Sequence, residues 1–185
     1  MAVLTIDELF RRLQEWGTGD YGLSDVTQLE HALQSAALAK EQGLGDAQVI
    51  AALFHDIGHL TTKNDVALAD HGIDDRHEDT GGAMLRRCFG EAVAEPVRLH
   101  VAAKRYLCTV EPDYFSTLSE DSVRSLELQG GLLNDTERAA FEAEPWFREG
   151  VALRRIDDLA KEPGKAVPEL TEYRAMADAL AAGGH

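Results

Sequence analysis

The 185-residue sequence predicts an all-α fold with a buried metal site. Apolar residues recur at spacings of three and four, and no segment alternates apolar and polar residues long enough to form a convincing strand. Capping residues and glycines divide the chain into pieces of helix length. In addition, His55-Asp56 ends the apolar stretch 49–54. A carboxylate there is costly unless a metal ion supplies the missing positive charge.

The first three expected helices are each marked by a start or stop signal. Thr5–Glu8 has the pattern of a capping box and opens an amphipathic helix. Ser24 or Asp25 is expected to cap the second helix. Asp46 is expected to cap the third helix, which Gly58 ends. Each of these helices is long enough to present one apolar face to a core.

The second half of the chain continues the helical pattern. A helix is expected to begin near Pro96, a favoured first-turn residue, and to run to about Tyr106. The stretches 60–76 and 108–117 are expected to be irregular. Further helices are expected at residues 76–89, 119–129, 135–143, 147–161 and 168–182.

Length and composition favour one domain, residues 1–185, with its core at about 21–161. No apolar run approaches the roughly 20 residues of a membrane span, and the N-terminus lacks the pattern of a signal peptide. A cytoplasmic protein is therefore expected, with Cys88 and Cys108 as free thiols. The net charge of −15 argues against nucleic acid as a partner. The sequence leaves the oligomeric state open.

Six residues within or at the ends of predicted helices are candidate metal ligands. Imidazole and carboxylate ligands together suit iron, manganese or zinc. Six ligands exceed the need of one tetrahedral zinc, so two metals bridged by a carboxylate are expected. Taken singly, a histidine in a helix is usually a surface or hydrogen-bonded residue, so the prediction depends on the joint pattern. The candidates are His31, His55, Asp56, His77, His100 and Asp157.

This order of ligands resembles the HD-domain superfamily, which is named for a His…His-Asp…Asp signature. His31, His55-Asp56 and Asp157 match the signature, and the resemblance covers about Tyr21 to Lys161. The additional pair, His77 and His100, matches the subset that holds two metals. The resemblance implies that Asp56 bridges the metals, with His31, His55 and Asp157 completing one site and His77 and His100 the other.

Local strings resemble one branch of the superfamily, the mixed-valent diiron oxygenases that cleave the carbon–phosphorus bond of 1-hydroxyphosphonates. The strings are 28–31, 99–107, 129–131 and 154–161, together with Tyr21 ten residues before His31. The resemblance implies two iron ions as Fe(II)/Fe(III), dioxygen as co-substrate and a small organophosphonate as substrate. It also implies that Tyr21, His59 and Lys104 are catalytic residues.

Several residues near the ligands would form a cradle for a phosphonate dianion. Lys104 lies one helical turn after His100, and Arg154 lies three residues before Asp157. A cation beside a metal cluster is disfavoured unless an anion lies between them. In the branch that the chain resembles, the corresponding positions contact the phosphonate. The expected substrate contacts are Tyr21, Ser24, His59, Lys104, Ser122, Ser125, Gln129 and Arg154.

Ser24 indicates which substituent the substrate carries on its amino group. In the branch member that accepts a primary amine, a glutamate lies three residues after the tyrosine, where this chain has Ser24. A small residue suits a trimethylammonium group, which has no N–H to donate. A preference for 1-hydroxy-2-(trimethylammonio)ethylphosphonate, giving glycine betaine and phosphate, is therefore expected. Tyr21 or Tyr106 would supply a cation–π face.

Three other functions fit the same ligands. A metal-dependent phosphohydrolase acting on a nucleotide or phosphate monoester would use the same His-Asp core and consume no dioxygen. An inositol-type oxygenase would not need the cationic Lys104 and Arg154. In a non-catalytic sensor, replacement of Asp56 by alanine would unfold the protein without a separate loss of activity.

Overall fold

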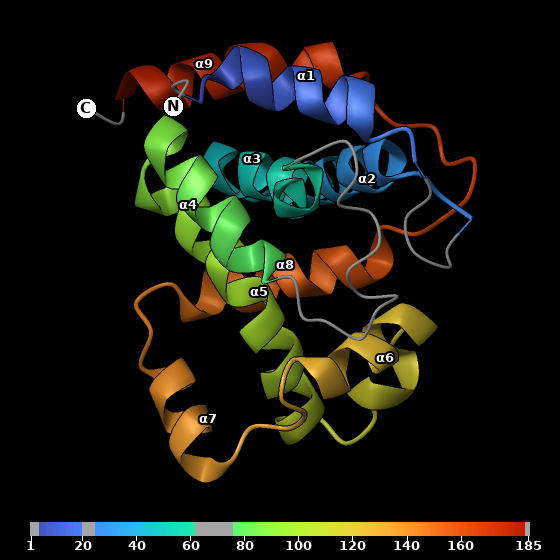
Figure 1. Cartoon of the computed structure of the whole chain (residues 1–185), viewed down its shortest axis with the longest axis vertical. Helices are drawn as coiled ribbons and strands as arrows, with labels where there is room; N and C mark the ends of the chain where they lie inside the picture. Colours follow the sequence, from blue (N-terminus) through green and yellow to red (C-terminus); the bar gives the residue numbers. More distant parts are fainter. Residues whose placement is uncertain (1–3, 20–24, 62–75, 184–185) are drawn as a thin grey trace.

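The helices of the computed structural model lie in stacked layers (Figure 1). The structure describes residues 4–19, 25–61 and 76–183. The outer layer pairs α1 (Ile6–Trp16) with α9 (Arg174–Gly183), and Arg174 joins the two through an ion pair with Asp7. Beneath them lie α2 (Gln28–Glu41) and α3 (Asp46–Phe54), and α8 (Phe147–Leu159) follows on their far side. The central helices are therefore covered on two sides.

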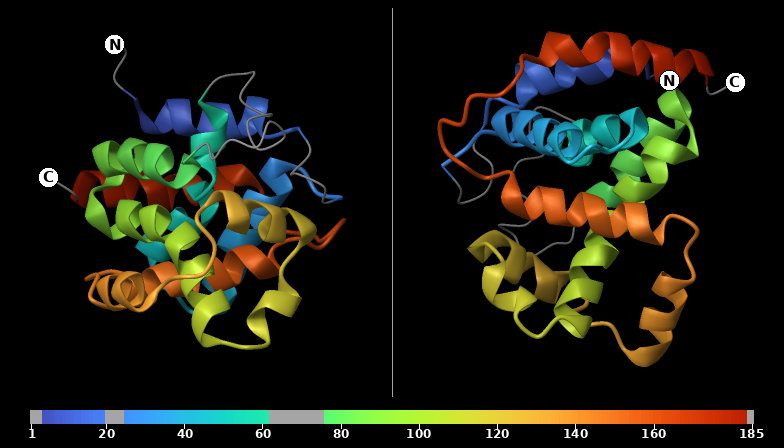
Figure 2. Two further views of the ribbon diagram at one scale, coloured as in Figure 1. Left: turned by 60° about the horizontal axis from the view of Figure 1, so that its bottom comes forward. Right: turned by 180° about the vertical axis from the view of Figure 1, so that it is seen from behind.

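Two further helices run past these layers. α4 (His77–Phe89) packs along α5 (Glu91–Val110), which also packs against α3 and α8. The far end of α5 extends toward α6 (Glu120–Leu128) and α7 (Asp135–Glu142), as Figure 2 shows from behind. Within the described residues, three short 3₁₀ helices connect the larger elements: η1 (Ile57–Leu60), η3 (Tyr114–Thr117) and η4 (Leu170–Tyr173). The predicted all-α fold is confirmed.

The N-terminal caps differ in part from those expected. Thr5 caps α1 by accepting a hydrogen bond from the Glu8 backbone N–H, but the Glu8 carboxylate binds Arg11 and Arg12 and does not complete a capping box. The prediction that Ser24 or Asp25 caps the second helix was wrong. Thr27 is the cap, because its hydroxyl and the Glu30 carboxylate form a reciprocal capping box. Ser24 lies outside the described residues.

The third helix begins and ends earlier than expected. Gly45 is its cap and Asp46 its first helical residue, so the prediction of Asp46 as a side-chain cap was wrong. The α-helix ends at Phe54, and Gly58 lies inside the tighter turn of η1. A Cβ at Gly58 would lie 2.0 Å from the carbonyl oxygen of His77. The close approach of η1 to the start of α4 therefore requires glycine at this position.

The helix expected from Pro96 to Tyr106 is longer at both ends. Gly90 has a φ of 77° that reverses the chain, and α5 begins at the next residue and continues to Val110. Pro96 lies inside the helix, where it removes one backbone donor. Its neighbours Val93 and Val97 are fully buried. Their packing therefore favours helix across the proline. The predicted helix 168–182 is divided at Arg174 into η4 and α9.

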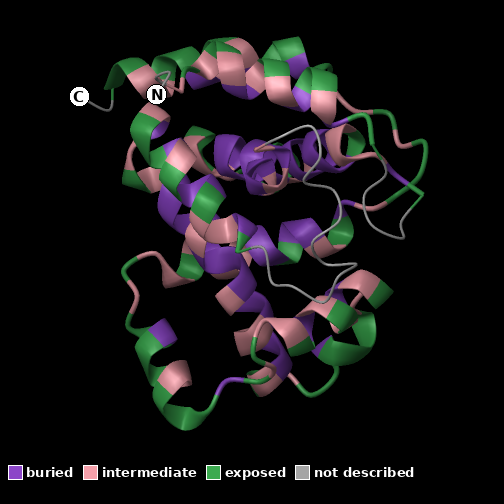
Figure 3. Ribbon diagram, viewed as in Figure 1, coloured by how far each residue is buried: buried purple, intermediate pink, exposed green. Residues whose placement is uncertain are grey.

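The main core lies where α2, α3, α4, α5 and α8 meet, and Figure 3 shows its buried residues in these elements. Several polar side chains share this interior. They are His31, His55, His77, His100, Lys104, Arg154 and Asp157. Both cysteines are free thiols, as predicted. Among the described helices, none combines the length and hydropathy required to cross a membrane.

Candidate metal centre

Four helices and the turn after α3 bring the six predicted ligands together in the core. His31 lies in the first turn of α2, His77 begins α4, and His100 lies in the middle of α5. His55 and Asp56 follow the last residue of α3, and Asp157 lies near the end of α8. Because these helices pack on one another, residues up to 126 positions apart in sequence become neighbours.

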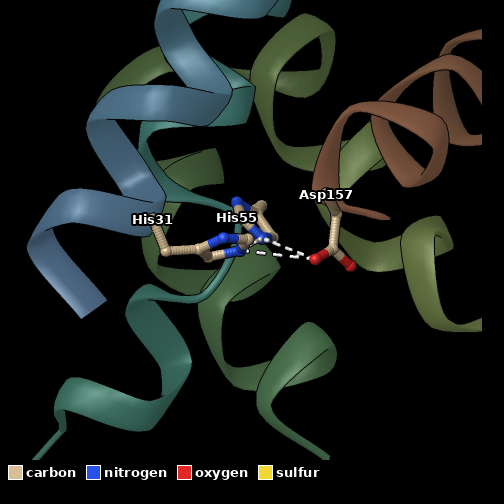
Figure 4. A group of neighbouring side chains, drawn as sticks. All are labelled: His31, His55 and Asp157. Atoms are coloured by element: carbon tan, nitrogen blue, oxygen red, sulfur yellow. Dashed lines mark hydrogen bonds and ion pairs between the residues drawn. The ribbon is translucent and has the colours of Figure 1, made fainter. Parts of the chain in front are cut away.

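The first ligand group contains His31, His55 and Asp157. The two imidazoles approach through their Nε2 atoms at 3.1 Å, and Asp157 Oδ1 lies 3.3 Å from His31 Nε2 and 3.9 Å from His55 Nε2. Figure 4 shows the two rings and the carboxylate converging from α2, the turn after α3 and α8. Asp56 joins this group through Oδ2, which lies 3.3 Å from His55 Nε2 and 3.7 Å from His31 Nε2.

The second ligand group contains His77 and His100, whose Nε2 atoms lie 3.2 Å apart. The other oxygen of Asp56, Oδ1, lies 3.6 Å from His77 Nε2 and 3.7 Å from His100 Nε2. Asp56 therefore presents one oxygen to each imidazole pair. This is the arrangement required of a carboxylate that bridges two metals.

Backbone carbonyls orient the imidazoles of His31, His55 and His100. The Nδ1 atoms of His31, His55 and His100 lie 2.8, 2.8 and 2.6 Å from carbonyl oxygens of residues 160, 52 and 97. Since a carbonyl oxygen only accepts, each Nδ1 carries a proton, and each ring in its neutral form presents its Nε2 lone pair to the centre. Such carbonyl contacts orient metal-binding histidines.

The residues fit a metal ion because their arrangement is electrostatically incomplete without a cation. Two Nε2 lone pairs that face each other at 3.1 Å repel unless a positive charge lies between them. Asp56 Oδ2 and Asp157 Oδ1 are buried without a hydrogen-bond partner, although Lys161 forms an ion pair with the latter at 3.2 Å. The mixed nitrogen and oxygen donors suit iron, manganese or zinc.

The titration behaviour of the ligands leads to the same conclusion. Burial lowers the pKa of His31, and it lowers the pKa of His100 to about 3. Burial also acts to lower the pKa of His55, but the adjacent carboxylates of Asp56 and Asp157 outweigh it and raise this pKa to about 9. In the metal-free protein, a proton on His55 would supply the positive charge. A metal ion would replace that proton.

A second polar cluster lies beside the ligands and contains four predicted substrate contacts. Lys104 follows His100 by one turn of α5 and is 2% exposed. Its Nζ donates to Ser125 Oγ at 2.6 Å and to the Ser122 carbonyl oxygen at 3.3 Å. Burial, followed by the charge of Arg154, lowers the pKa of Lys104 to about 7. These contacts exclude a solvated helix face for Lys104.

Arg154 belongs to the same cluster and is 4% exposed. Its Nη1 forms an ion pair with Asp157 Oδ2 at 2.8 Å, and its Nη2 donates to Ser122 Oγ at 3.1 Å. The structure therefore brings together Lys104, Ser122, Ser125 and Arg154, and it joins them to the ligand Asp157.

The other predicted substrate residues lie in different parts of the chain. His59 lies in η1, its ring stacked on that of His77 with centroids 4.0 Å apart, and close enough to Asp56 and His77 to share a metal ion. Gln129 caps the C-terminus of α6, and its Oε1 is buried without a hydrogen-bond partner. Tyr21 and Ser24 lie outside the described residues.

The structure does not support Tyr106 as a cation–π face. Its ring packs against Phe141 and Phe147, with centroids 5.3 and 5.2 Å away. Tyr106 lies two residues after Lys104, a spacing that places it on the other side of α5 from Lys104. It therefore contributes to the contact with α7 and α8 and not to the polar cluster.

Two residues of the polar cluster were missed by the sequence analysis. Tyr114 of η3 donates its hydroxyl proton to Asp158, and Asp158 also pairs with Arg154. Asp158 carried a local signal, since it lies four residues after Arg154 on a predicted helix. Tyr114 carried none, because it lies in a stretch that was expected to be irregular.

Comparisons with known proteins give a consistent set of similarities. A family model described as "HD domain" matches residues 29–182. A hydroxymethylphosphonate dioxygenase of Gimesia maris is 50% identical over 169 residues, which cover 91% of this chain and 84% of that protein. The glycine-betaine-forming [1-hydroxy-2-(trimethylamino)ethyl]phosphonate dioxygenase of Leisingera caerulea is 38% identical over 160 residues, covering 86% and 82%. An uncharacterised protein of Acanthamoeba polyphaga mimivirus is 32% identical over 174 residues, covering 93% and 80%.

Proposed function

The chain belongs to the HD-domain family, and on that premise we propose that it is a dioxygenase that cleaves the carbon–phosphorus bond of a 1-hydroxyphosphonate. One observation carries most of the proposal. Asp56 presents an oxygen to each of two imidazole pairs, and the buried ammonium of Lys104 lies one helical turn from His100. A two-metal centre beside a buried cation suits an anionic substrate.

The proposed cofactor is a pair of iron ions, one ferrous and one ferric. His31, His55 and Asp157 would hold one ion, His77 and His100 the other, and Asp56 both. When bound, such a pair supplies dioxygen activation at one ion and Lewis acidity toward the substrate hydroxyl at the other. The resemblance of Tyr21 to a residue that occupies the resting site supports a substrate that enters by displacing it.

The protein residues of the polar cluster would bind and orient the phosphonate. A dianion beside Lys104 favours the charged form of the ammonium, which burial disfavours in the free protein. Ser125 and the Ser122 carbonyl hold the ammonium in place. Gln129 offers a side-chain amide at the end of α6, and His59 lies on the side of His77. These groups would exclude bulk water from the phosphonate.

The overall reaction balances with dioxygen as the sole oxidant. Both atoms of dioxygen appear in the products, one on C1 and one on phosphorus, as the C–P and C1–H bonds are broken. With 1-hydroxy-2-(trimethylammonio)ethylphosphonate the products are glycine betaine and phosphate. Ser24 in place of a glutamate supports this substrate over the corresponding primary amine, since a serine offers no carboxylate to an ammonium group.

A second candidate substrate is hydroxymethylphosphonate, which would give formate and phosphate. The specific observation in its favour is the 50% identity to a protein named for that substrate, against 38% for the trimethylamino case. The packing of Tyr106 against Phe141 and Phe147 also favours hydroxymethylphosphonate. Tyr106 was one of the two tyrosines considered as a cation–π face for a trimethylammonium group, and this packing removes it.

The rival functions have less support. A phosphohydrolase would use the same ligands, but both named relatives with catalytic descriptions are dioxygenases. An inositol-type oxygenase would leave the buried ammonium of Lys104 without a substrate anion to bind. A sensor would need no buried cation beside the metals.

The test is aerobic turnover by the iron-loaded protein. Phosphate release and oxygen uptake are measured with hydroxymethylphosphonate, the trimethylammonio compound and the primary amine. We expect phosphate and consumed dioxygen in equal amounts with one of the first two compounds. Phosphate release without oxygen uptake would establish a hydrolase, and no phosphate from any of the three would overturn the proposal.

A further inference from the structure

Arg154, Tyr114 and Asp158 form a closed ring of hydrogen bonds next to the ligand Asp157. The Tyr114 hydroxyl donates to Asp158 Oδ2 and accepts from Arg154 Nε at 3.2 Å. Arg154 Nη2 in turn donates to Asp158 Oδ1. Tyr114 is 7% exposed and Arg154 4%, so the ring lies in the interior. It joins η3 to α8 across 40 residues of sequence.

The ring determines where the remaining N–H groups of Arg154 point. A guanidinium is planar, so two fixed nitrogens orient the third. With Nε on Tyr114 and Nη2 on Asp158, Nη1 reaches Asp157 Oδ2 at 2.8 Å. The other oxygen of Asp157 is then the one that faces His31 and His55.

The same guanidinium determines the hydrogen-bonding role of the Ser122 hydroxyl. Ser122 Oγ accepts from Arg154 Nη2 at 3.1 Å and from Ser119 Oγ at 3.1 Å. A hydroxyl oxygen has two lone pairs, and both are then used. The Ser122 proton is left to donate to a third group. An oxygen of a bound phosphonate is a suitable acceptor beside the ammonium of Lys104.

Asp158 and Tyr114 are not candidates for direct roles at the metals. Both carboxylate oxygens of Asp158 are engaged, one by Arg154 and one by Tyr114, whereas the neighbouring Asp157 faces the imidazoles. Burial raises the pKa of Tyr114, and the charge of Asp158 raises it further against the opposing effect of Arg154. The phenol therefore keeps its proton and acts as a donor to Asp158.

We infer that Tyr114 and Asp158 are positioning residues for phosphonate binding, which act by holding the Arg154 guanidinium in the orientation that keeps Ser122 a donor. This inference rests on the proposed function for the identity of the anion. It assigns to η3, a short turn without any predicted role, a contribution to substrate affinity. It also predicts that affinity for the anion, and not the chemical step, depends on the hydroxyl of Tyr114.

The test compares three variants of the full-length, iron-loaded protein. Tyr114→Phe removes one hydroxyl from the ring, and Asp158→Asn removes its negative charge. Tyr173→Phe is the matched control, since Tyr173 is a tyrosine 2% exposed whose hydroxyl has no hydrogen-bond partner and which lies in η4. The readouts are the Kd for methylphosphonate by calorimetry, KM and kcat for phosphate release, iron content and Tm.

For Tyr114→Phe and Asp158→Asn we expect Kd and KM to rise about tenfold at equal iron content, as for the loss of one hydrogen bond to a charged group. We expect kcat to change by less than about threefold, and Tyr173→Phe to match the wild type. A lower Tm with wild-type Kd and KM in both variants would overturn the inference. If the wild type binds methylphosphonate but releases no phosphate, the proposed function fails, while the effect of Tyr114→Phe on Kd still decides the inference.

Discussion

The two halves of the candidate metal centre differ in how deeply their side chains are buried and in what orients them. His31, His55 and Asp157 are 1%, 0% and 2% exposed, and both histidines contact backbone carbonyls through Nδ1. In the other half, His100 is 2% exposed and also contacts a backbone carbonyl through Nδ1, whereas His77 is 8% exposed and its Nδ1 lies 3.7 Å from the side chain of Glu78.

This difference indicates which ligands the fold holds in position before a metal ion binds. Backbone contacts from α3 and from the residue after α8 orient the first half before any metal binds. In the second half the Val97 carbonyl orients His100, and the contact between η1 and the first residue of α4 sets the position of His77. We therefore expect the second half to be the easier one to disturb by substitution, with the first half retaining its metal.

The largest expected effect comes from the one residue that both halves share. Asp56→Asn removes the charge from both oxygens, so we expect both metals to be lost and kcat to fall at least about 1,000-fold, equivalent to about 4 kcal/mol of transition-state stabilisation. Metal content and phosphate release measure this.

Asp135→Asn is the control for Asp56→Asn, because its side chain is 98% exposed. If Asp56→Asn kept both metals, the bridging role would be wrong. If it unfolded the protein while activity followed the folded fraction, a structural metal would explain the centre.

Gly58→Ala is expected to disturb the second half of the centre and to leave the first half intact. The new Cβ would meet the backbone of His77, and the resulting shift of α4 is expected to cost about 1–3 kcal/mol of stability. We expect the metal content to fall from two ions to one per chain. Gly19→Ala, where a Cβ meets nothing within 4 Å, serves as the control. Loss of metal from both halves in equal measure would contradict the comparison.

Lys104 provides a pH test in the polar cluster. Burial holds its pKa at about 7, so its ammonium is charged below pH 7 and loses its proton as the pH rises through that value. We expect KM for the phosphonate to increase above pH 7 and the Lys104→Met variant to lack this increase while binding about tenfold more weakly at pH 6. The ionisation of the phosphonate itself is common to both proteins. Parallel KM profiles in the two proteins would exclude Lys104 as the anion-binding cation.

The smallest effect is expected on the outer face of α8. Arg155 pairs with Glu111 at the surface, and the two side chains are 47% and 43% exposed. Arg155→Gln should change the free energy of unfolding by less than about 1 kcal/mol and leave KM unchanged. If KM rose as much as in an Arg154 variant, the exposed Arg155 would contribute as much to substrate binding as the buried Arg154, which would contradict this prediction.

The sequence predicted what local spacing encodes. The helix pattern and the six candidate ligands follow from short-range periodicity and residue type, and the structure brings all six together. The cap of α2 was misplaced because Thr27 competes with two equally suitable residues upstream. The start of α5 was missed because the buried side chains of Val93 and Ala94 favour helix before Pro96, and burial is a tertiary effect.

The polar cluster shows the limit of local spacing most directly. Lys104 and Arg154 were found because each lies one turn from a ligand. The Tyr114 hydroxyl meets Asp158 only because η3 packs on α8, 44 residues away in sequence, and no periodicity encodes that contact. The roles of Tyr21 and Ser24 stay predictions from the resemblance.

The central claim is that Asp56 bridges two metals, and anomalous scattering at the iron edge from crystals of the iron-loaded protein tests it most directly. We predict two peaks, one between Asp56 Oδ2 and the group of His31, His55 and Asp157, and one between Asp56 Oδ1 and the pair of His77 and His100. A single peak, or two peaks of which one does not touch Asp56, would contradict the account.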